Sequence, residues 1–305
     1  MEPFIVYVLG CGSAKPTTRH FASSQVVEVR GRVFMVDCGE GTQIQLRRAK
    51  VRFTRLRAVF ITHLHGDHCF GLIGLICSFA LSGRMVPLHV YAPQALKKLL
   101  DDMLAIFAPD LSFEVIFHPV DTTASQVIYE DSAVTVTTLP LKHRIPCCGY
   151  LFREKPTLPH IRRDMVDFYH IPVTKMMDIK NGADWTDEDG NVVANERLVT
   201  PPDPIRSFAY CSDTRYMPAL HQFIEGVSLL YHESTYDERH KDLAEAYCHS
   251  TAAEAATVAL QAKAHQLLIG HYSSRYEDES VLLREAQSIF PQTTLAQEGM
   301  VVDVL

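Results

Sequence analysis

The stretch F-I-T-H-L-H-G-D-H-C-F-G-L, residues 60–72, crowds three histidines and an aspartate together and decides the fold. Its first residues complete an apolar run, 58–62, that predicts a short buried strand. The cluster therefore follows the C-terminal end of a strand, on a loop in which Gly66 permits a tight turn. Because imidazole nitrogen and carboxylate oxygen suit Zn²⁺, a metal site is favoured over a pH-sensitive or merely polar loop. The candidate ligands are His63, His65, Asp67 and His68.

Four side chains are too few to complete two metal shells, so further ligands are expected at other strand ends. His143 follows the predicted strand 133–141, Asp213 ends 207–213, and His271 ends 265–271. A lone histidine near a strand end is usually an ordinary core or surface residue, and the dense cluster is what favours the metal interpretation. We expect one ion to be held by His63, His65 and His143, and the other by Asp67, His68 and His271, with Asp213 bridging.

The rest of the chain predicts an α/β protein. Its strands alternate with helices, but some neighbouring strands are linked as hairpins, which favours two mixed sheets with helices outside. Residues 153–204 are rich in charge and proline, have poor apolar periodicity and predict a projecting arm. Further strands are expected at 4–9, 25–30, 33–37, 87–93, 113–120 and 227–234, and helices at 94–107, 250–264 and 277–289.

Composition limits the class of protein. The 305 residues are 47% hydrophobic, which suffices for one large core or two small ones. Eight cysteines without a C-x-x-C pair predict reduced thiols and a cytoplasmic protein, and no apolar run is long enough to cross a bilayer. Because the net charge is −7, a nucleic-acid partner requires a local basic patch. Residues 47–57 carry six basic side chains, which indicate either phosphate contacts or an ordinary solvated surface.

Motifs across the whole chain resemble one family. The pattern H-x-H-x-D-H after a buried strand is similar to the metallo-β-lactamase superfamily, and the order of the other motifs resembles its ribonuclease Z branch, the tRNA 3′-processing endonucleases. This resemblance implies a four-layer αβ/βα sandwich in one domain, 1–305, with two metal ions at one edge and a flexible substrate-binding arm inserted at about 153–204. It also implies the same seven ligands. The supporting motifs are V-D-C-G-E-G-T-Q, Y-H-E-S-T, C-H-S-T and G-H-Y-S-S-R-Y.

The resemblance further implies a function. The expected enzyme is a zinc-dependent endoribonuclease that removes the 3′ trailer from a tRNA precursor, leaving a tRNA 3′-hydroxyl and a 5′-phosphate on the trailer. It would hold two Zn²⁺ ions per subunit, with Mn²⁺ or Co²⁺ as substitutes, and form a homodimer. Asp67 would bind metal and accept a proton from water, His249 would protonate the leaving oxygen, and Glu233 would orient His249. Taken alone, His249 is an ordinary polar residue before a helix and Glu233 an ordinary carboxylate.

Substrate binding is the part in which the chain departs from the family pattern. The arm sequence 171–182 retains Lys180 and Gly182 but lacks the family's Gly-Pro pair, and the loop 16–20 retains Arg19 but lacks its lysine. We expect Arg19, Lys180 and Gly182 to contact substrate. The alternative function is a related binuclear phosphodiesterase acting on small or unstructured phosphodiesters. A metal-bound RNA-binding protein without catalysis and a thioester hydrolase explain the motifs less well.

Overall fold

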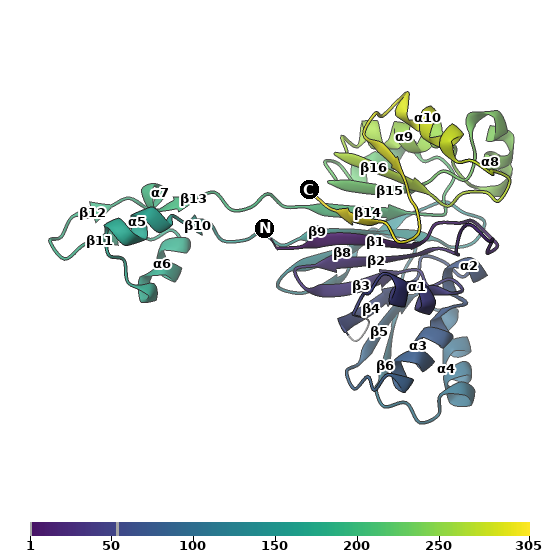
Figure 1. Ribbon diagram of the computed structural model, residues 1–305, viewed down its shortest axis with the longest axis horizontal. Coiled ribbons are helices and arrows are strands. Elements are labelled where there is room, and N and C mark those ends of the chain that lie inside the picture. The colour runs from purple at the N-terminus through teal and green to yellow at the C-terminus, as the bar shows by residue number, and fades with distance from the viewer. Residues whose placement is uncertain (1, 53–54) are drawn as a thin grey trace. The chain divides into compact units, whose positions relative to one another are not determined.

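The computed structural model describes residues 2–52 and 55–305 (Figure 1). The described chain divides into two compact units, one formed by 2–153 together with 206–305 and the other by 154–205. The larger unit contains two seven-stranded mixed sheets whose outer faces are covered by helices (Figure 1). This confirms the predicted α/β fold of four layers.

The first sheet has the strand order β18-β1-β2-β3-β4-β5-β6. Strands β1 to β3 pair antiparallel as hairpin neighbours, whereas β3 to β6 pair parallel. Parallel strands place their carboxyl ends at the same edge, which is where side chains from different strands can converge. The bounds are β1 (Phe4–Gly10), β2 (Ser24–Val29), β3 (Arg32–Val36), β4 (Leu56–Phe60), β5 (Leu88–Ala92), β6 (Val115–Pro119) and β18 (Val301–Asp303).

The second sheet has the order β17-β16-β15-β14-β9-β8-β7. Strands β14 to β17 pair parallel, and β9 pairs antiparallel with β14. The sequence predicted β8, β14, β15 and β16 but missed β9. The bounds are β7 (Val127–Glu130), β8 (Val134–Pro140), β9 (Cys148–Glu154), β14 (Ser207–Cys211), β15 (Leu229–Glu233), β16 (Gln266–Gly270) and β17 (Thr293–Leu295).

Helices cover both sheets. Thr251 and Glu254 form a reciprocal capping box at the start of the alanine-rich helix α9 (Ala252–Gln261). Short 3₁₀ helices, η3 (Pro218–Phe223) and η4 (Glu238–His240), occupy connections. The α-helices of the larger unit are α1 (Thr42–Arg48), α2 (Gly66–Cys69), α3 (Leu72–Leu81), α4 (Leu96–Phe107), α8 (Lys241–Tyr247), α9 (Ala252–Gln261) and α10 (Ser280–Gln287).

Two apolar cores hold these layers together. Aromatic rings fill the space between the sheets, where Phe60 of β4 lies 5.3 Å from Tyr150 of β9, and Phe34 of β3 lies 5.8 Å from Phe152, between ring centroids. The other core packs α1, α3 and α4 against the first sheet. Burial of large aromatic side chains contributes much of the stability of such a sandwich. The packing therefore fixes the strand ends of the two sheets with respect to each other.

The sequence prediction was wrong about the backbone of the metal-capable stretch. His63 and His65 do lie on a loop, but Gly66 starts the single-turn helix α2, which carries Asp67 and His68. Gly66 does not form a tight turn with positive φ, and a Cβ atom there would lie 2.3 Å from the exposed Phe70 ring and displace it. The helical turn aims Asp67 and His68 differently from the loop histidines.

The smaller unit, 154–205, has a core of its own. It consists of β10 (His160–Ile161) paired with β13 (Val199–Thr200), β11 (Trp185–Thr186) paired with β12 (Val192–Val193), and the short helices α5 (Arg163–Phe168), η2 (Val173–Lys175), α6 (Met176–Lys180) and α7 (Asn195–Leu198). Its buried residues are Val166, Ile171, Ile179, Val193 and Leu198. The segment thus folds locally, despite the poor periodicity of its sequence.

Candidate metal centre

The seven predicted ligands come together in the larger unit at the carboxyl-terminal ends of its strands. The loop after β4 carries His63 and His65, and α2 carries Asp67 and His68. The second sheet contributes one residue after each of three strands: His143 after β8, Asp213 after β14 and His271 after β16. Every one of the seven belongs to a compact group of potential metal ligands.

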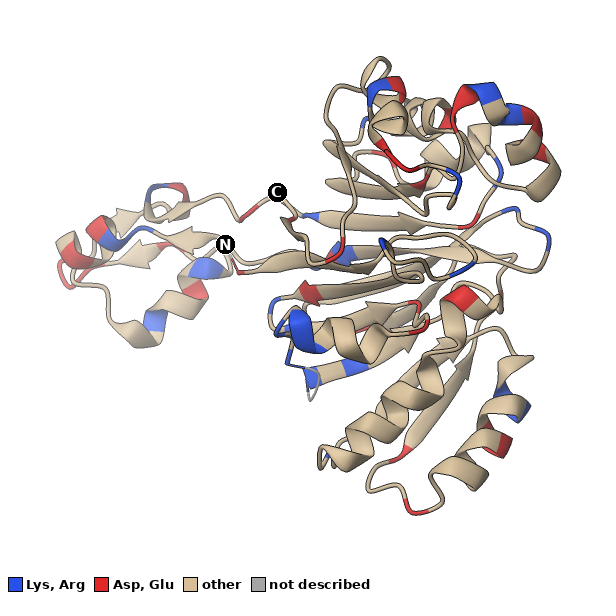
Figure 2. Ribbon diagram, turned by 45° about the vertical axis from the view of Figure 1, so that its right-hand side comes forward, with Lys and Arg blue, Asp and Glu red and all other residues tan. Residues whose placement is uncertain are grey.

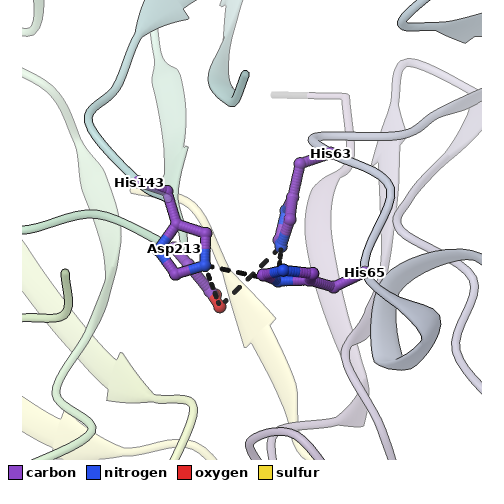
Figure 3. Close-up of side chains that lie close together, drawn as sticks. All are labelled: His63, His65, His143 and Asp213. Atoms are coloured by element: carbon purple, nitrogen blue, oxygen red, sulfur yellow. Dashed lines mark hydrogen bonds and ion pairs between the residues drawn. The ribbon is translucent and has the colours of Figure 1, made fainter. Parts of the chain in front are cut away.

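The first group contains three histidines and one oxygen of Asp213 (Figure 3). Nδ1 of His65 lies 2.9 Å from Nε2 of His63 and 3.3 Å from Nε2 of His143. Oδ2 of Asp213 lies 3.9 Å from Nε2 of both His63 and His143. Figure 3 shows the four side chains pointing toward one another, His63 and His65 from the loop after β4 and His143 and Asp213 from the second sheet.

The second group contains Asp67, His68 and His271. Oδ2 of Asp67 lies 3.5 Å from Nε2 of His68 and 3.6 Å from Nε2 of His271. The other carboxylate oxygen of Asp213, Oδ1, lies 3.4 Å from Nε2 of His68 and 3.1 Å from Nε2 of His271. Asp213 therefore offers one oxygen to each group, as a carboxylate that bridges two ions must.

The side chains fit a pair of metal ions chemically. Nε2 of His68 and Nε2 of His271 are buried, and although Asp213 lies near both, neither makes a hydrogen bond of good geometry with any of the described residues, which is costly unless another ligand satisfies them. Burial lowers the pKa of His63 well below its usual value, which favours the neutral imidazole that binds metal. Burial raises the pKa of Asp213, but His271 and His68 outweigh it and hold that pKa well below its usual range. Burial also lowers the pKa of His68, but Asp37, Asp213 and Asp67 outweigh it and raise that pKa well above its usual value, so His68 would release a proton on binding metal. Imidazole nitrogens and ionised carboxylates are the ligand chemistry of Zn²⁺.

Outer hydrogen bonds orient four of the histidine rings. The atoms that bond these rings on the side away from the cluster are Oγ1 of Thr62 for His63 at 3.0 Å, the carboxylate of Asp37 for His68 at 2.7 Å, the carbonyl oxygen of Cys248 for His143 at 2.9 Å, and Oγ1 of Thr235 for His271 at 3.0 Å. In each case the bond is made by Nδ1, so Nε2 faces the cluster. Such bonds fix the tautomer and the orientation of a ligand ring.

The sequence analysis missed these outer partners. Asp37 lay within a quoted motif but received no role, and that motif is the only sequence signal for it. Asp37 and His271 have positive φ angles of 57° and 61°, a conformation that residues other than glycine seldom adopt. Gly39, in the same motif, is needed for close packing, because a Cβ atom there would lie 2.4 Å from the carbonyl oxygen of Asp67.

His249 and Glu233 form a pair beside the cluster. Nδ1 of His249 lies 2.9 Å from Oε1 of Glu233, and Nδ1 is 3.9 Å from Oδ2 of Asp213. The buried Glu233 carboxylate also accepts hydrogen bonds from the backbone N–H groups of Thr214 and Ser250. Burial lowers the pKa of His249, but the adjacent Glu233 outweighs burial and raises that pKa to about 9. His249 is therefore a protonated group at the edge of the cleft that His65, Asp67 and Asp213 line.

Of the predicted substrate contacts, Arg19 belongs to the larger unit and does not line this cleft. Arg19 donates hydrogen bonds to the carbonyl oxygens of Glu277 and Tyr276 and pairs with Glu279 at 2.9 Å, so its guanidinium is already engaged. Lys180 and Gly182 belong to the smaller unit. The predicted basic stretch 47–57 surrounds the end of α1 and the start of β4, where Figure 2 shows basic residues gathered; its residues 53 and 54 lie outside the described part.

Solved structures share this architecture. The metallo-β-lactamase fold protein YhfI from Bacillus subtilis is 20% identical and has a TM-score of 0.70, with 99% of this chain and 100% of that chain covered. At that identity the likeness concerns the fold. Together with the buried His/Asp cluster, it defines a metallo-β-lactamase-type protein whose site is consistent with a binuclear metal centre.

Full-length relatives narrow the class. Proteins named ribonuclease Z from Bacteroides fragilis and Bacteroides thetaiotaomicron are each 54% identical over 304 residues, covering 100% of this chain and 100% and 96% of those proteins. The short form of human tRNase Z is 26% identical with a TM-score of 0.70, and 99% of each chain is covered. The chain belongs to the ribonuclease Z family. The predicted family, with its phosphodiester endonuclease activity in tRNA 3′ processing, is thereby confirmed.

A family model covers only part of the chain. Residues 4–157 match the model described as Anti-Pycsar protein Apyc1. This range contains His63, His65 and His143 but ends before Asp213 and His271. The match therefore concerns the first part of the site, whereas the ribonuclease Z relatives span all of it.

Proposed function

We propose that the seven side chains hold two divalent metal ions, zinc in the native protein, with Mn²⁺ or Co²⁺ as working substitutes. His63, His65 and His143 would hold one ion and Asp67, His68 and His271 the other. The observation that carries this assignment is Asp213, whose Oδ2 and Oδ1 face one group each. The partnerless Nε2 atoms of His68 and His271 support it further. When bound, such ions acidify water and neutralise charge on phosphate oxygens.

His249 is assigned as the proton donor to the leaving ribose 3′ oxygen. Because Glu233 occupies Nδ1, the proton available for transfer is the one on Nε2. Burial raises the pKa of Glu233, but His249 outweighs it and lowers that pKa, so the carboxylate stays ionised and holds the imidazolium in place. The bond between phosphorus and the 3′ oxygen breaks as the oxygen takes the proton. This leaves a 3′-hydroxyl on the tRNA and a 5′-phosphate on the trailer.

Asp67 is assigned as a metal ligand that also accepts the proton of the attacking water. Burial raises the pKa of Asp67, but His68 and His271 outweigh it and lower that pKa well below its usual range. The carboxylate is therefore ionised, as proton acceptance requires, although its basicity is weak. The backbone N–H of Ala14 donates to Oδ2 of Asp67 at 2.8 Å and holds the carboxylate in position.

The compact unit 154–205 is assigned as the substrate-binding arm, inserted into a single metallo-β-lactamase-type domain. Lys180 and Gly182 are its proposed substrate contacts, and Arg19 is the proposed contact on the larger unit, where binding would require it to leave Glu279. The precursor tRNA is the proposed substrate, and a homodimer the proposed assembly. Support for the dimer comes from highly exposed apolar side chains on α3 and α4, such as Leu81 at 91% and Ile106 at 71%.

A cytoplasmic location is proposed because all eight cysteines are free thiols, as expected in a reducing compartment. In the part of the chain that the structure describes, we find no helix with the length and apolar character that a bilayer crossing needs. The location proposal therefore rests on the thiols.

The deciding experiment is cleavage of a 3′-extended tRNA precursor by the metal-loaded protein, with products mapped at nucleotide resolution. His65→Ala and His249→Ala are tested alongside His265→Ala, which changes an exposed histidine outside the site. We expect one cut after the last nucleotide of the mature tRNA, lost in the first two variants and retained in the third. An intact precursor, combined with hydrolysis of a small chromogenic phosphodiester, would favour the alternative phosphodiesterase function.

A further inference from the structure

A second groove begins where the metal cleft ends. The cleft and the groove share four residues, Ser13, Ala14, Arg144 and His249. The other residues that line the groove are Lys15, Thr235, Tyr236, Tyr247, Ser273 and Ser274. Thr235 bonds His271 and Glu233, whereas the other five belong neither to the proposed metal site nor to the Glu233–His249 pair.

The groove is basic and aromatic. The Arg144 guanidinium lies 5.7 Å from the centroid of the Tyr247 ring, and that of Arg275 lies 5.5 Å from the centroid of Tyr236. Tyr236 in turn packs edge-on against His249, with ring centroids 6.3 Å apart. Lys15, Arg144 and Arg275 are exposed, and none of them forms an ion pair with a carboxylate of the described residues. The chain has a net charge of −7, so these three cations near His249 make the surface around the groove locally positive.

The part of the metal cleft that is not shared with the groove has a different character. It is lined by Glu40 and Phe70, neither of which reaches the groove. Glu40 is exposed and negatively charged, and Phe70 is 66% exposed. A polyanion passing through the cleft would therefore meet positive charge on the His249 side and an acidic, apolar rim on the other.

The chemistry of cleavage indicates on which side of the cleft each part of the substrate lies. The proton donor must lie next to the leaving 3′ oxygen, and that oxygen belongs to the nucleotide on the 5′ side of the scissile phosphate. With His249 as donor, this nucleotide lies on the His249 side, and the trailer lies toward Phe70 and Glu40.

We propose that the groove is the subsite for the nucleotide immediately 5′ of the scissile phosphate, the last nucleotide of the mature tRNA. Its base stacks on the planar Arg144–Tyr247 pair, of which Tyr247 is 45% exposed. Lys15 and Arg275 supply positive charge for its 5′ phosphate. Base stacking on aromatic and guanidinium planes tolerates any base, as a subsite serving many tRNAs requires. The inference rests on the proposed role of His249 and on the proposed substrate.

The test uses the metal-loaded full chain and three precursors: unmodified, abasic at the last nucleotide of the mature tRNA, and abasic at the first trailer nucleotide. Tyr247→Ala is compared with the wild type, and Arg284→Gln, which changes an exposed arginine of α10, is the control. Loss of one stacked base should weaken the apparent affinity of the wild type by about ten-fold. The same loss is expected when Tyr247→Ala acts on the unmodified precursor.

The combination decides between outcomes. On the precursor that lacks the upstream base, Tyr247→Ala should have the same apparent affinity as the wild type. On the precursor that lacks the trailer base, Tyr247→Ala should still bind about ten-fold more weakly than the wild type. The inference is overturned if the effects of the substitution and of the missing base multiply on both abasic precursors. It is also overturned if Tyr247→Ala weakens the apparent affinity for bis(p-nitrophenyl) phosphate, which has no upstream nucleotide, by the same factor.

Binding of the mature tRNA, with and without its last base, is measured in parallel because it does not depend on cleavage. Base-dependent binding that Tyr247→Ala abolishes supports the subsite even if the precursor is not cut, in which case only the proposed function fails. Binding that ignores the last base overturns the subsite, whether or not cleavage occurs.

Discussion

Oδ2 of Asp37 lies 2.7 Å from Nδ1 of His68, on the side of the ring that faces away from the metal-capable cluster. Both side chains are completely buried. Asp37 is itself held by the backbone N–H and the hydroxyl of Thr62, at 2.9 and 3.0 Å from Oδ1. The bond to Asp37 occupies Nδ1, so Nε2 of His68 is the nitrogen that faces the cluster. Asp37 thus fixes the orientation of a candidate ligand ring.

Replacing Asp37 by Asn should weaken metal binding by about 10- to 100-fold, because the ring of His68 loses its charged partner. Asn tolerates the positive φ of this position, so the backbone is not strained. Zinc affinity is measured by competition with a chelator. The matched control is Asp237→Asn, which alters another buried Asp–His pair, with His240, outside the cluster. A zinc affinity equal in Asp37→Asn and wild type would contradict the assigned role.

His249→Ala should reduce kcat for the tRNA precursor by about 10²- to 10⁴-fold, since a ribose oxygen leaves poorly without a proton. The loss on bis(p-nitrophenyl) phosphate should be far smaller, because p-nitrophenolate leaves without protonation. Turnover of both substrates is measured at one pH, with His265→Ala as the control for removing an imidazole. Equal losses on the two substrates would mean that His249 acts through the metal site and not as the acid.

Lys180→Gln should weaken binding of the precursor and reduce the slope of log affinity against log salt concentration by about one, the effect of one lost phosphate contact. The affinity is measured by equilibrium titration over a range of salt concentrations. Lys263→Gln serves as the comparison, because Lys263 is exposed and paired with Glu225 at 2.7 Å in the larger unit. An unchanged slope for Lys180→Gln would remove this residue from the proposed binding surface.

His20 should stabilise the fold in a pH-dependent way. Its Nδ1 lies 3.0 Å from Glu298 and its Nε2 lies 3.2 Å from Glu279. The bond to Glu298 raises the pKa of His20, although burial opposes it. A raised histidine pKa adds stability that is fully present below the unfolded pKa of about 6.5 and is lost as pH rises through the folded value.

His20→Asn is therefore expected to lower the free energy of unfolding by on the order of 1 kcal/mol at about pH 5.5, and by clearly less at about pH 8.5. Chemical denaturation of the variant and the wild type at each pH gives the difference. His221→Asn, which removes a ring that bonds the carbonyl oxygen of Pro218, serves as the comparison for loss of an imidazole elsewhere in the fold. A loss of unfolding free energy in His20→Asn that is larger at about pH 8.5 than at about pH 5.5 would contradict a raised pKa of His20.

Strand positions and candidate metal ligands could be predicted because both depend on local pattern. Runs such as 133–141 and 266–270 are largely apolar, and each candidate ligand lies where its run ends. Strand β9 was missed, although Cys148, Tyr150 and Phe152 are completely buried. It pairs between β14 and β8 in the second sheet, and side chains on both of its faces are buried, so no polar alternation marks it.

Taken by itself, the sequence determined the family, the two-sheet architecture and the seven candidate ligands, because the types of residue and their order along the chain carry that information. Only the tertiary structure decided which oxygen of Asp213 faces which group of histidines. It also decided that the carbonyl of Cys248, 105 positions from His143, orients that ring. A backbone carbonyl is the same in every residue, and packing of the two sheets selects the one that lies within reach.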